Sequence, residues 1–218
     1  MSFFHKGVNV KYTDVIWDFN GTILDDVEIG VCSINVLLEA RGLPRLSCDT
    51  YREVSGFPIV DYYKRIGFDF SEEPYDKVAL EWVAQYRSRE SQAPLYDGVR
   101  EVLAYLRQKG LRLTLLSATE IDMLNSQVSS LELNSYFDEI CGMDNVYAHG
   151  KVSLGHAWRK RNMDARVLFV GDTDHDFEVA AAMGADCVLF SGGHQSSERL
   201  LKLGAPVIGS LSELKKYI

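Results

Sequence analysis

The stretch from Val15 to Asp25 constrains the fold of this chain more than any other part of its sequence. It begins with the apolar run Val15–Trp17, which is typical of a buried β-strand, and this run leads directly to the carboxylate of Asp18. The chain then breaks at Gly21, after Asn20. A buried strand that delivers an acidic side chain to its C-terminal end is where open α/β sheets bind their ligands. Taken alone, the same residues also fit a strand followed by an ordinary polar turn.

Apolar runs of strand length alternate with helical patterns in the second half of the sequence. Strands are predicted at Leu111–Leu116, Phe137–Cys141, Arg166–Gly171, Cys187–Phe190 and Val207–Ile208. Helices are predicted at Val99–Lys109, from Thr119 or Glu120 to Leu131, and at Lys151–Met163, Phe177–Met183, Ser196–Leu203 and Leu211–Ile218. Because alternating strands and helices form a parallel sheet covered on both faces, the predicted fold is α/β, a Rossmann-like three-layer α/β/α sandwich.

A block of helical patterns separates the first strand from the rest of this α/β region. Its helices are predicted at Val27–Arg41, Asp49–Val54, Val60–Ile66 and Pro74–Arg89, and nothing from residue 27 to 92 has strand character. The last of these helices has an apolar face made of Tyr75, Val78, Trp82, Val83 and Tyr86. We therefore expect a core domain of residues 1–25 and 93–218, and a small all-helical domain of residues 26–92 inserted after the first strand.

Size and composition fit this organisation and exclude several classes of function. With 218 residues, of which 46% are hydrophobic and 25% charged, the chain can bury a full core and carry an insertion. No apolar run approaches the roughly 20 residues that cross a bilayer, and residues 1–11 lack a secretory signal, so we expect a cytoplasmic protein without a membrane partner. The net charge is −8 and Lys and Arg form no dense cluster apart from Arg159–Arg161, which argues against nucleic acid as a partner. The four scattered cysteines show no CxxC spacing and are expected to be reduced and mostly buried.

Three predicted strands end in polar side chains that would meet at one edge of the sheet, namely Asp18, Ser117 and Asp172. One strand that runs into a polar residue is common, and Ser117 alone fits an ordinary loop. Asp172 and Asp176 lie within one turn of each other, and such a dense anionic cluster needs a cation. Oxygen ligands favour Mg²⁺. Asp176, or Asp174 before it, also fits a role limited to capping the following helix.

These stretches resemble, in chain order, the four motifs of the haloacid dehalogenase (HAD) superfamily. Its first motif is matched by Asp18, Thr22, Ile23, Leu24 and Asp25. The segment Leu113–Thr119 resembles the second motif and Gly171–Asp176 the fourth. Lys151, which follows Gly150, matches the third motif, a lone cation. By itself Lys151 fits a surface lysine equally well, whereas Lys160 and Arg161, further along the same helix, are expected to face solvent.

The resemblance implies roles for individual residues. Asp18 would be the nucleophile that forms an aspartyl-phosphate, assisted by Thr22, and Lys151 would offset negative charge. Ser117 would hydrogen-bond the transferring phosphoryl group, with Gly21 and Ala118 as further contacts to substrate. Mg²⁺ would be held by Asp18, the backbone carbonyl of Asn20 and Asp172, with Asp176 as a ligand through water or as an orienting group.

The inserted block resembles the C1 cap of the superfamily, a helical lid that suits small substrates. Its stretch Arg52–Pro58 resembles the substrate-reading loop of the phosphoglycolate-phosphatase and phosphoglucomutase-like branch, which makes Ser55, Gly56 and Phe57 candidate substrate-binding residues. The alternative is that Gly56 and Pro58 only separate two helices.

Asn20 departs from the family pattern. Phosphatases of the family carry an Asp at this position, which protonates the leaving oxygen and then activates water, and an amide does neither. A substrate with a good leaving group, such as an acyl phosphate or a phosphonate, would need no acid. Another side chain could substitute, with His149 and His175 adjacent to core motifs. The chain could also bind a phosphorylated ligand without turnover, or carry an engineered substitution that traps a complex.

We therefore predict a Mg²⁺-dependent HAD-like hydrolase, a phosphatase acting on a small phosphorylated metabolite as a monomer or homodimer. The alternatives are a C–P bond (phosphonate) or other hydrolase of the same fold, and a catalytically impaired protein that binds a phosphorylated ligand.

Overall fold

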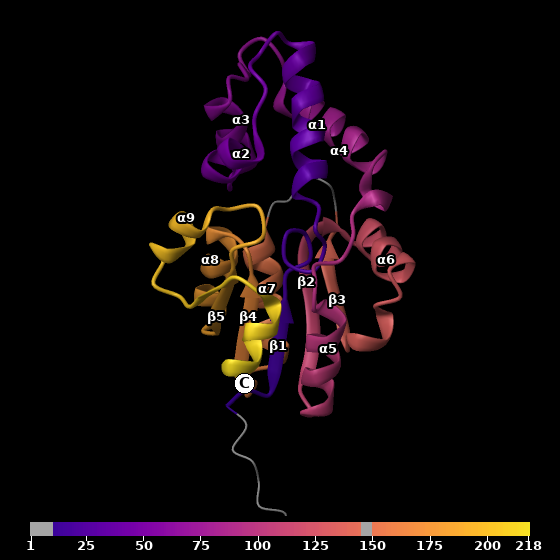
Figure 1. Cartoon of the computed structure of the whole chain (residues 1–218), viewed down its shortest axis with the longest axis vertical. Helices are drawn as coiled ribbons and strands as arrows, with labels where there is room; N and C mark the ends of the chain where they lie inside the picture. Colours follow the sequence, from indigo (N-terminus) through magenta and orange to yellow (C-terminus); the bar gives the residue numbers. More distant parts are fainter. Residues whose placement is uncertain (1–10, 145–149) are drawn as a thin grey trace, which may run out of the picture.

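The computed structural model describes residues 11–144 and 150–218, which form an α/β core with a group of helices above it (Figure 1). The described part of the core contains six strands: β1 (Asp14–Trp17), β2 (Arg112–Glu120), β3 (Glu139–Met143), β4 (Val167–Gly171), β5 (Asp186–Phe190) and β6 (Val207–Ile208). They form one parallel sheet in the order β3-β2-β1-β4-β5-β6. β1 is thus central, with β2 on one side and β4 on the other.

Helices cover both faces of this sheet. They are α5 (Val99–Gln108), α6 (Ile121–Ser130), α7 (Lys151–Arg161), α8 (Asp174–Met183), α9 (Ser197–Leu201) and the 3₁₀ helix η3 (Leu211–Lys216). Alternate residues of β1 point to opposite faces, so that Val15 and Trp17 pack with α5, α6 and η3, whereas Ile16 packs with α7, α8 and α9. The predicted three-layer α/β/α sandwich is confirmed.

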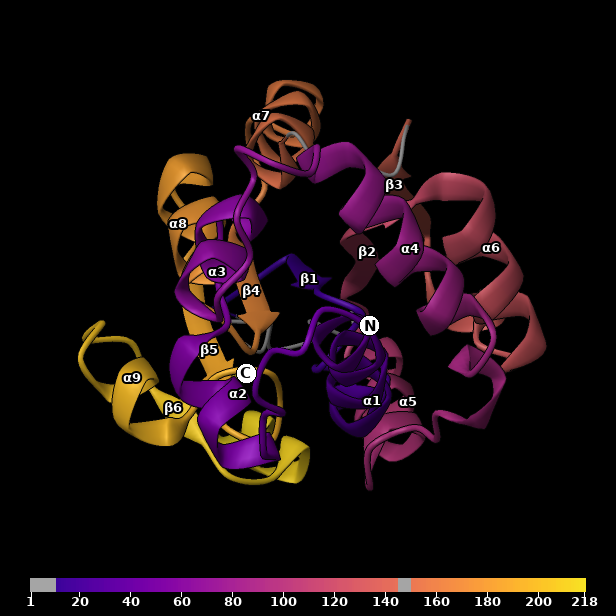
Figure 2. The same ribbon diagram turned by 90° about the horizontal axis from the view of Figure 1, so that it is seen from above.

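Four α-helices follow β1 and precede α5 in the sequence: α1 (Val27–Ala40), α2 (Cys48–Val54), α3 (Ile59–Arg65) and α4 (Tyr75–Arg87). They stand above the C-terminal ends of the strands, and in the view from above α3 and α4 lie over opposite parts of the sheet (Figure 2). These helices share a hydrophobic cluster of their own, which includes Ile34, Leu38, Tyr63 and Val78. We call residues 26–92 the cap; these boundaries stay a prediction from the sequence.

Arg199 of α9 ties the cap to the core. Its guanidinium donates hydrogen bonds to the backbone carbonyls of Arg52, Glu53 and Ser55 at the end of α2, and it pairs with Asp174 at 3.0 Å. Positive charge at a helix C-terminus is favourable because the last carbonyls of the helix lack partners within it.

Several predicted elements differ from the structure in detail. The second strand runs through Ser117 to Glu120, with an irregular register after Leu116, so that Ser117 lies within an extended segment instead of at its end. The helix after β4 begins at Asp174, three residues before the predicted start at Phe177, because Thr173 caps it. The predicted terminal helix is a 3₁₀ helix that ends at Lys216.

The prediction of mostly buried cysteines is wrong. Only Cys187 is buried, whereas Cys48 and Cys141 are partly exposed and Cys32 lies on the exposed side of α1. Within the described residues, no helix is both long and apolar enough to cross a lipid bilayer.

Candidate active site

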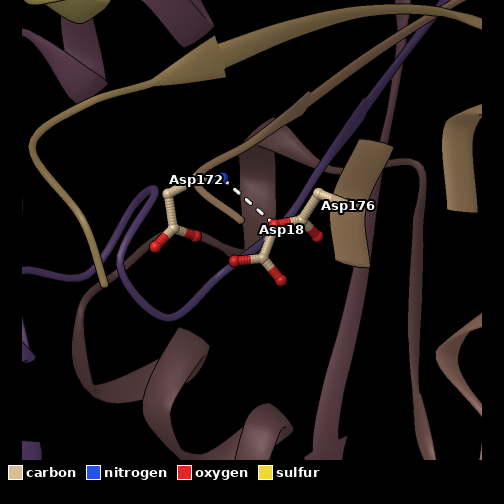
Figure 3. A group of neighbouring side chains, drawn as sticks. All are labelled: Asp18, Asp172 and Asp176. Carbon is tan, nitrogen blue, oxygen red and sulfur yellow. Dashed lines mark hydrogen bonds between the residues drawn. The ribbon is translucent and has the colours of Figure 1, made fainter. Parts of the chain in front are cut away.

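Three carboxylates meet at the C-terminal edge of the sheet. Asp18 follows β1 and Asp172 follows the adjacent strand β4, while Asp176 lies in the first turn of α8. All three are buried, and one oxygen of each lies within 4.8 Å of the others (Figure 3). The pairing of β1 with β4 therefore brings residues 18 and 172 together, although they are far apart in the chain.

Local backbone geometry fixes the two carboxylates that follow β4. Thr173 caps α8, and Asp176 Oδ2 accepts hydrogen bonds from the backbone N–H groups of Asp172 and Thr173 at 3.1 and 3.0 Å and from the Thr173 hydroxyl at 2.7 Å. Asp176 thus takes part in the helix cap and in the cluster at the same time. Asp172 accepts from the Thr22 hydroxyl at 3.0 Å and from the backbone N–H of His194 at 2.7 Å.

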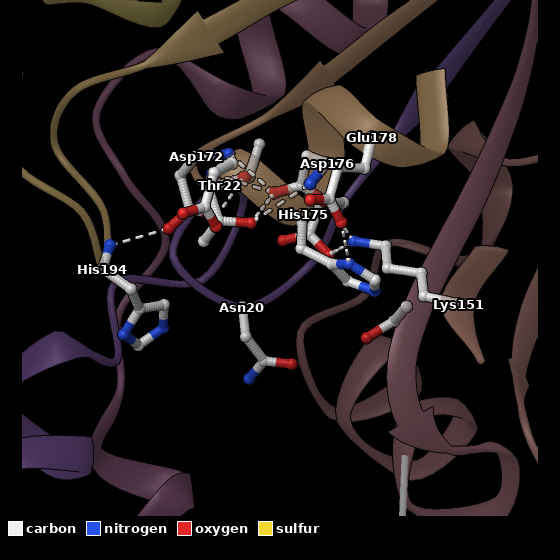
Figure 4. A network of polar contacts seen from close by, with 12 residues as sticks. Asn20, Thr22, Lys151, Asp172, His175, Asp176, Glu178 and His194 are labelled. Carbon is white, nitrogen blue, oxygen red and sulfur yellow. Dashed lines mark hydrogen bonds and ion pairs between the residues drawn. The ribbon is translucent and has the colours of Figure 1, made fainter. Parts of the chain in front are cut away.

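Lys151 provides the positive charge of the cluster. It is the first residue of α7, and its buried ammonium pairs with Asp18 and with Asp176. Figure 4 shows Lys151 reaching toward Asp176. Burial opposes its ionisation, but the two carboxylates prevail and raise the pKa of Lys151. Lys160 and Arg161 are exposed, as predicted.

The cluster carries more negative charge than Lys151 offsets. Burial, reinforced by the neighbouring Asp176 and Asp172, raises the pKa of Asp18 well above its ordinary value. Burial likewise raises the pKa of Asp172 to about 6. Burial also opposes ionisation of Asp176, but the Lys151 ammonium and the hydrogen bonds from Thr173 hold the pKa of Asp176 below its usual range. Three buried carboxylates beside one ammonium are a donor set that fits a divalent cation with oxygen ligands, such as Mg²⁺.

Gly21 allows the loop after β1 to pass close to this cluster. Its φ angle is +76°, and a Cβ atom here would lie 2.3 Å from Asp172 Oδ2 and 2.4 Å from His194 Cδ2. A side chain would therefore displace Asp172 as well as strain the backbone. Gly21 and Thr22 are not among the described residues that line the cavity above the cluster, so their contacts are with Asp172 and its surroundings.

The side chain of Asn20 is held by hydrogen bonds that require an amide. Its Nδ2 donates to Asp26 Oδ2 and to the hydroxyl of Tyr86, both at 2.8 Å, and its Oδ1 accepts from the Thr119 hydroxyl at 2.7 Å. Tyr86 also donates to Asp26 Oδ2 at 2.7 Å. Because Tyr86 belongs to α4 and Thr119 to β2, residue 20 connects the cap with the core.

Two residues of the second motif lie beside this network. Ser117 is buried, and its hydroxyl donates to Thr119 Oγ1 at 3.0 Å and accepts from the Thr119 N–H at 3.1 Å. Ser117 and Ala118 line the same cavity as Asp18, Lys151, Asp172 and Asp176. The structure thus brings together the predicted residues of β1, β2, α7 and β4.

The cavity between the core and the cap has a volume of about 250 Å³. The predicted cap residues Ser55, Gly56 and Phe57 all line it. The Ser55 hydroxyl donates to the backbone carbonyl of His194 at 2.7 Å, and the Phe57 ring stacks on His175 with 4.4 Å between ring centroids. The 55–57 loop therefore closes the cavity against two histidine-bearing segments of the core.

Sequence reasoning missed His194, which lies in the loop after β5. Its Nε2 lies 3.2 Å from Asp26 Oδ1 and its Nδ1 lies 2.9 Å from the Tyr51 hydroxyl. Burial opposes its protonation, but the Asp26 carboxylate prevails and raises the pKa of His194 to about 9. Its position after Gly192 and Gly193, beyond the end of a predicted strand, was a signal of the same kind as Asp18 and Asp172.

Asp26, Tyr86 and Thr119 were also missed, because nothing in their local sequence indicates contact with residue 20. Of the two histidines that were considered as replacement acids, His175 lines the cavity and its Nδ1 lies 3.2 Å from Glu178. His149 lies outside the described residues.

The arrangement agrees with comparisons to known proteins. The haloacid dehalogenase-like hydrolase family matches residues 15–190. The chain is 27% identical to the tyrosine-protein kinase PtkA of Mycobacterium tuberculosis over 211 residues, covering 94% of this chain and 72% of that protein. It is 22% identical to a phosphoglycolate phosphatase of Pseudomonas savastanoi over 215 residues, covering 94% and 78%.

A solved structure shares the fold over nearly the whole chain. It is a haloacid dehalogenase-like family hydrolase from Streptococcus pneumoniae, which superimposes with a TM-score of 0.81 at 18% identity and covers 95% of this chain and 98% of its own. The match of the family to residues 15–190 includes the first strand, the cap and the acidic cluster. The chain therefore belongs to the haloacid dehalogenase-like hydrolase family.

Proposed function

We propose that this protein is a Mg²⁺-dependent phosphatase that hydrolyses a small phosphorylated metabolite, with Asp18 as the nucleophile. The observation that carries the proposal is the cluster of Asp18, Asp172 and Asp176 around Lys151, buried beneath a cavity that the cap covers. Membership of a hydrolase family and the similarity to phosphoglycolate phosphatases support the reaction class.

In this proposal Asp18 attacks the phosphorus atom and becomes phosphorylated, and water then hydrolyses the aspartyl-phosphate. The Lys151 ammonium holds the Asp18 carboxylate in one orientation and offsets the charge of the phosphoryl group. The Ser117 hydroxyl and the backbone at Ala118 would hydrogen-bond the phosphoryl oxygens. Asp18, the Asn20 carbonyl and Asp172 would hold Mg²⁺, with Asp176 oriented behind them, and the bound ion would supply charge stabilisation for the transferring group.

The cap gives the reaction a closed compartment. Its loop 55–57 and α4 complete the cavity, and exclusion of water from such a space strengthens every electrostatic contact within it. A cavity of about 250 Å³ suits a small substrate and not a folded phosphoprotein.

The hydrogen bonds of Asn20 favour a leaving group that departs without protonation. Both donors of its amide are already engaged, and an amide has no proton to transfer at neutral pH. Asp26, the nearest carboxylate, is ionised, because His194 and the hydrogen bonds from Tyr86 and Asn20 outweigh the effect of burial and lower its pKa. Neither residue therefore replaces the missing acid.

Phosphate release from acetyl phosphate tests the proposal, since this small acyl phosphate needs no general acid. We expect turnover with Mg²⁺, none in EDTA, and loss of turnover in Asp18→Asn. Lys151→Ala should reduce the rate strongly, whereas Lys160→Ala, an exposed lysine of the same helix, should not. Turnover that persists in Asp18→Asn, or none in the parent protein at any Mg²⁺ concentration, would overturn the proposal.

Three expectations stay predictions from the sequence: a cytoplasmic location, no nucleic-acid partner, and a monomeric or homodimeric state.

A further inference from the structure

The cap gives the cavity an aromatic wall. Helix α4 contributes Tyr75, Trp82 and Tyr86 to it, with Trp82 and Tyr86 stacked at 5.1 Å between ring centroids. Facing segments add Tyr62 of α3 and Met123 of α6. Flat aromatic walls of this kind bind another ring by offset stacking or edge-to-face contact.

Two cations line the described part of the cavity, Lys151 and the protonated His194, and both are already paired with carboxylates of the protein, so neither is free for an acidic organic group. Among the residues that the structure describes, Lys151 is the one Lys or Arg that lines the cavity, and both Asp18 and Asp176 already pair with it. The imidazole of His194 contacts Asp26 and Tyr51 through its two nitrogens. A carboxylate on the organic part of the substrate would therefore be buried without a partner, which is unfavourable.

A second, independent observation concerns the leaving group. The side-chain amide of Asn20 makes three hydrogen bonds. The neighbouring carboxylate of Asp26 accepts hydrogen bonds from the Gly21 N–H, the Asn20 amide and the Tyr86 hydroxyl. Neither Asn20 nor Asp26 therefore has a proton to give to the leaving oxygen. A phenol has a pKa of about 10, as in tyrosine, and its anion departs far more readily than an alkoxide, whose basicity is close to that of hydroxide.

From these two observations we infer that the substrate is a small aryl phosphate, an uncharged aromatic ring joined to phosphate through a phenolic oxygen. The inference rests on the proposed phosphatase function and specifies its substrate class. The ring would lie against Trp82 and Tyr86, and the phosphate would lie over Asp18 beside Ser117.

The chemical steps balance without an acid. An oxygen of Asp18 forms a bond to phosphorus while the bond from phosphorus to the phenolic oxygen breaks, and the electron pair leaves with the phenolate. The phenolate takes its proton from solvent. Water then attacks phosphorus, the bond from phosphorus to Asp18 breaks, and inorganic phosphate and a proton are released.

Four substrates separate recognition of the ring from departure of the leaving group: phenyl phosphate, benzyl phosphate, phosphoglycolate and acetyl phosphate. Phenyl phosphate should exceed phosphoglycolate in kcat/KM by at least about a hundredfold. Benzyl phosphate carries the ring but leaves as an alkoxide, so its KM should match that of phenyl phosphate while its kcat is at least about tenfold lower. Acetyl phosphate should be hydrolysed with a higher KM, because it leaves easily but lacks the ring.

Variants of α4 locate the ring. Trp82→Ala should raise the KM for phenyl phosphate by at least about tenfold, which corresponds to about 1.4 kcal/mol, and this factor should exceed its effect on the KM for acetyl phosphate. Leu80→Ala, a change at an exposed residue of the same helix, should alter the KM of neither substrate. Trp82→Leu keeps most of the volume, and its acetyl phosphate rate verifies that the cap remains folded.

The outcomes distinguish the two levels of the proposal. Two results would overturn the aryl inference without contradicting the phosphatase proposal. One is that the protein hydrolyses acetyl phosphate but prefers phosphoglycolate over phenyl phosphate. The other is that Trp82→Ala still hydrolyses acetyl phosphate and has an unchanged KM for phenyl phosphate. If no substrate is turned over, the phosphatase proposal and the substrate class fail together. Calorimetry with phenylphosphonate and phosphonoacetate then tests binding of the ring without turnover. If phosphonoacetate binds as tightly as phenylphosphonate, recognition of the ring is overturned as well.

Discussion

Replacing Asn20 by Asp tests whether the hydrogen-bond network at the cap boundary requires an amide. The new carboxylate would replace a donor that lies 2.8 Å from Asp26 Oδ2. Two charged carboxylates at that separation repel by about 6 kcal/mol at an effective dielectric constant of about 20. Taking up a proton on residue 20 avoids this repulsion and restores a donor to Asp26. The cost of Asn20→Asp is therefore the cost of protonating an aspartate whose unfolded pKa is near 3.9, about 4 kcal/mol at pH 7 and about 1.5 kcal/mol at pH 5.

The sign of the pH dependence follows from proton binding. In the variant the folded state holds a proton that the unfolded chain releases above about pH 4, so its unfolding free energy should fall, relative to the parent protein, as pH rises. Urea unfolding in EDTA at about pH 5 and pH 7 measures the difference, expected to be about 2.5 kcal/mol. Asn20→Ala is the matched control, since it removes the same hydrogen bonds at a cost that does not depend on pH. Equal destabilisation of Asn20→Asp at the two pH values would refute the reasoning.

Three further predictions concern the cluster and the contact between cap and core. Without metal, Asp18→Asn should raise the unfolding free energy measured in urea, because burial and like charges raise the pKa of Asp18 and its charged form destabilises the fold; an unchanged or lower value would contradict this. Burial raises the pKa of Asp172 to about 6, so the folded state binds this proton more tightly than the unfolded chain. The unfolding free energy in EDTA should therefore fall by up to about 3 kcal/mol between about pH 4 and pH 7, and this contribution to the pH dependence should be absent from Asp172→Asn. Arg199→Ala should release the end of α2 and speed limited proteolysis within residues 48–58. Arg161→Ala, a change at an exposed arginine of α7, should be cleaved at the same rate as the parent protein.

The fold and the acidic cluster were predictable because both depend on regular patterns. Apolar runs that end in a carboxylate predicted that Asp18 and Asp172 follow buried strands, and the parallel arrangement of strands then brings their ends together. Asp176 was recognised from the same stretch, with a place in the cluster and helix capping as alternatives, and in the structure it has both roles.

The network at residue 20 was not predictable, since its partners come from distant elements. The sequence indicated that Asn20 departs from the family pattern, but Tyr86 and Thr119 reach it only through the folded cap and β2. The apolar face of α4 was predicted as a packing face. In the structure Val78 is buried within the cap cluster, whereas Trp82 packs only partly against that cluster and also lines the cavity, and helical periodicity does not distinguish these two environments.

The central place of β1 in the sheet has a consequence for how the chain assembles. Its hydrogen-bonded neighbours begin at Arg112 and Val167, so β1 waits for about a hundred further residues before it can pair with β2, and for about fifty more before it can pair with β4. The helices of residues 27–87 depend on nearer contacts and can collapse earlier. We expect synthesis to produce a prefolded lid before the catalytic half exists, with an apolar strand tethered to it that is unpaired until β2 is made and is paired on both sides only after β4.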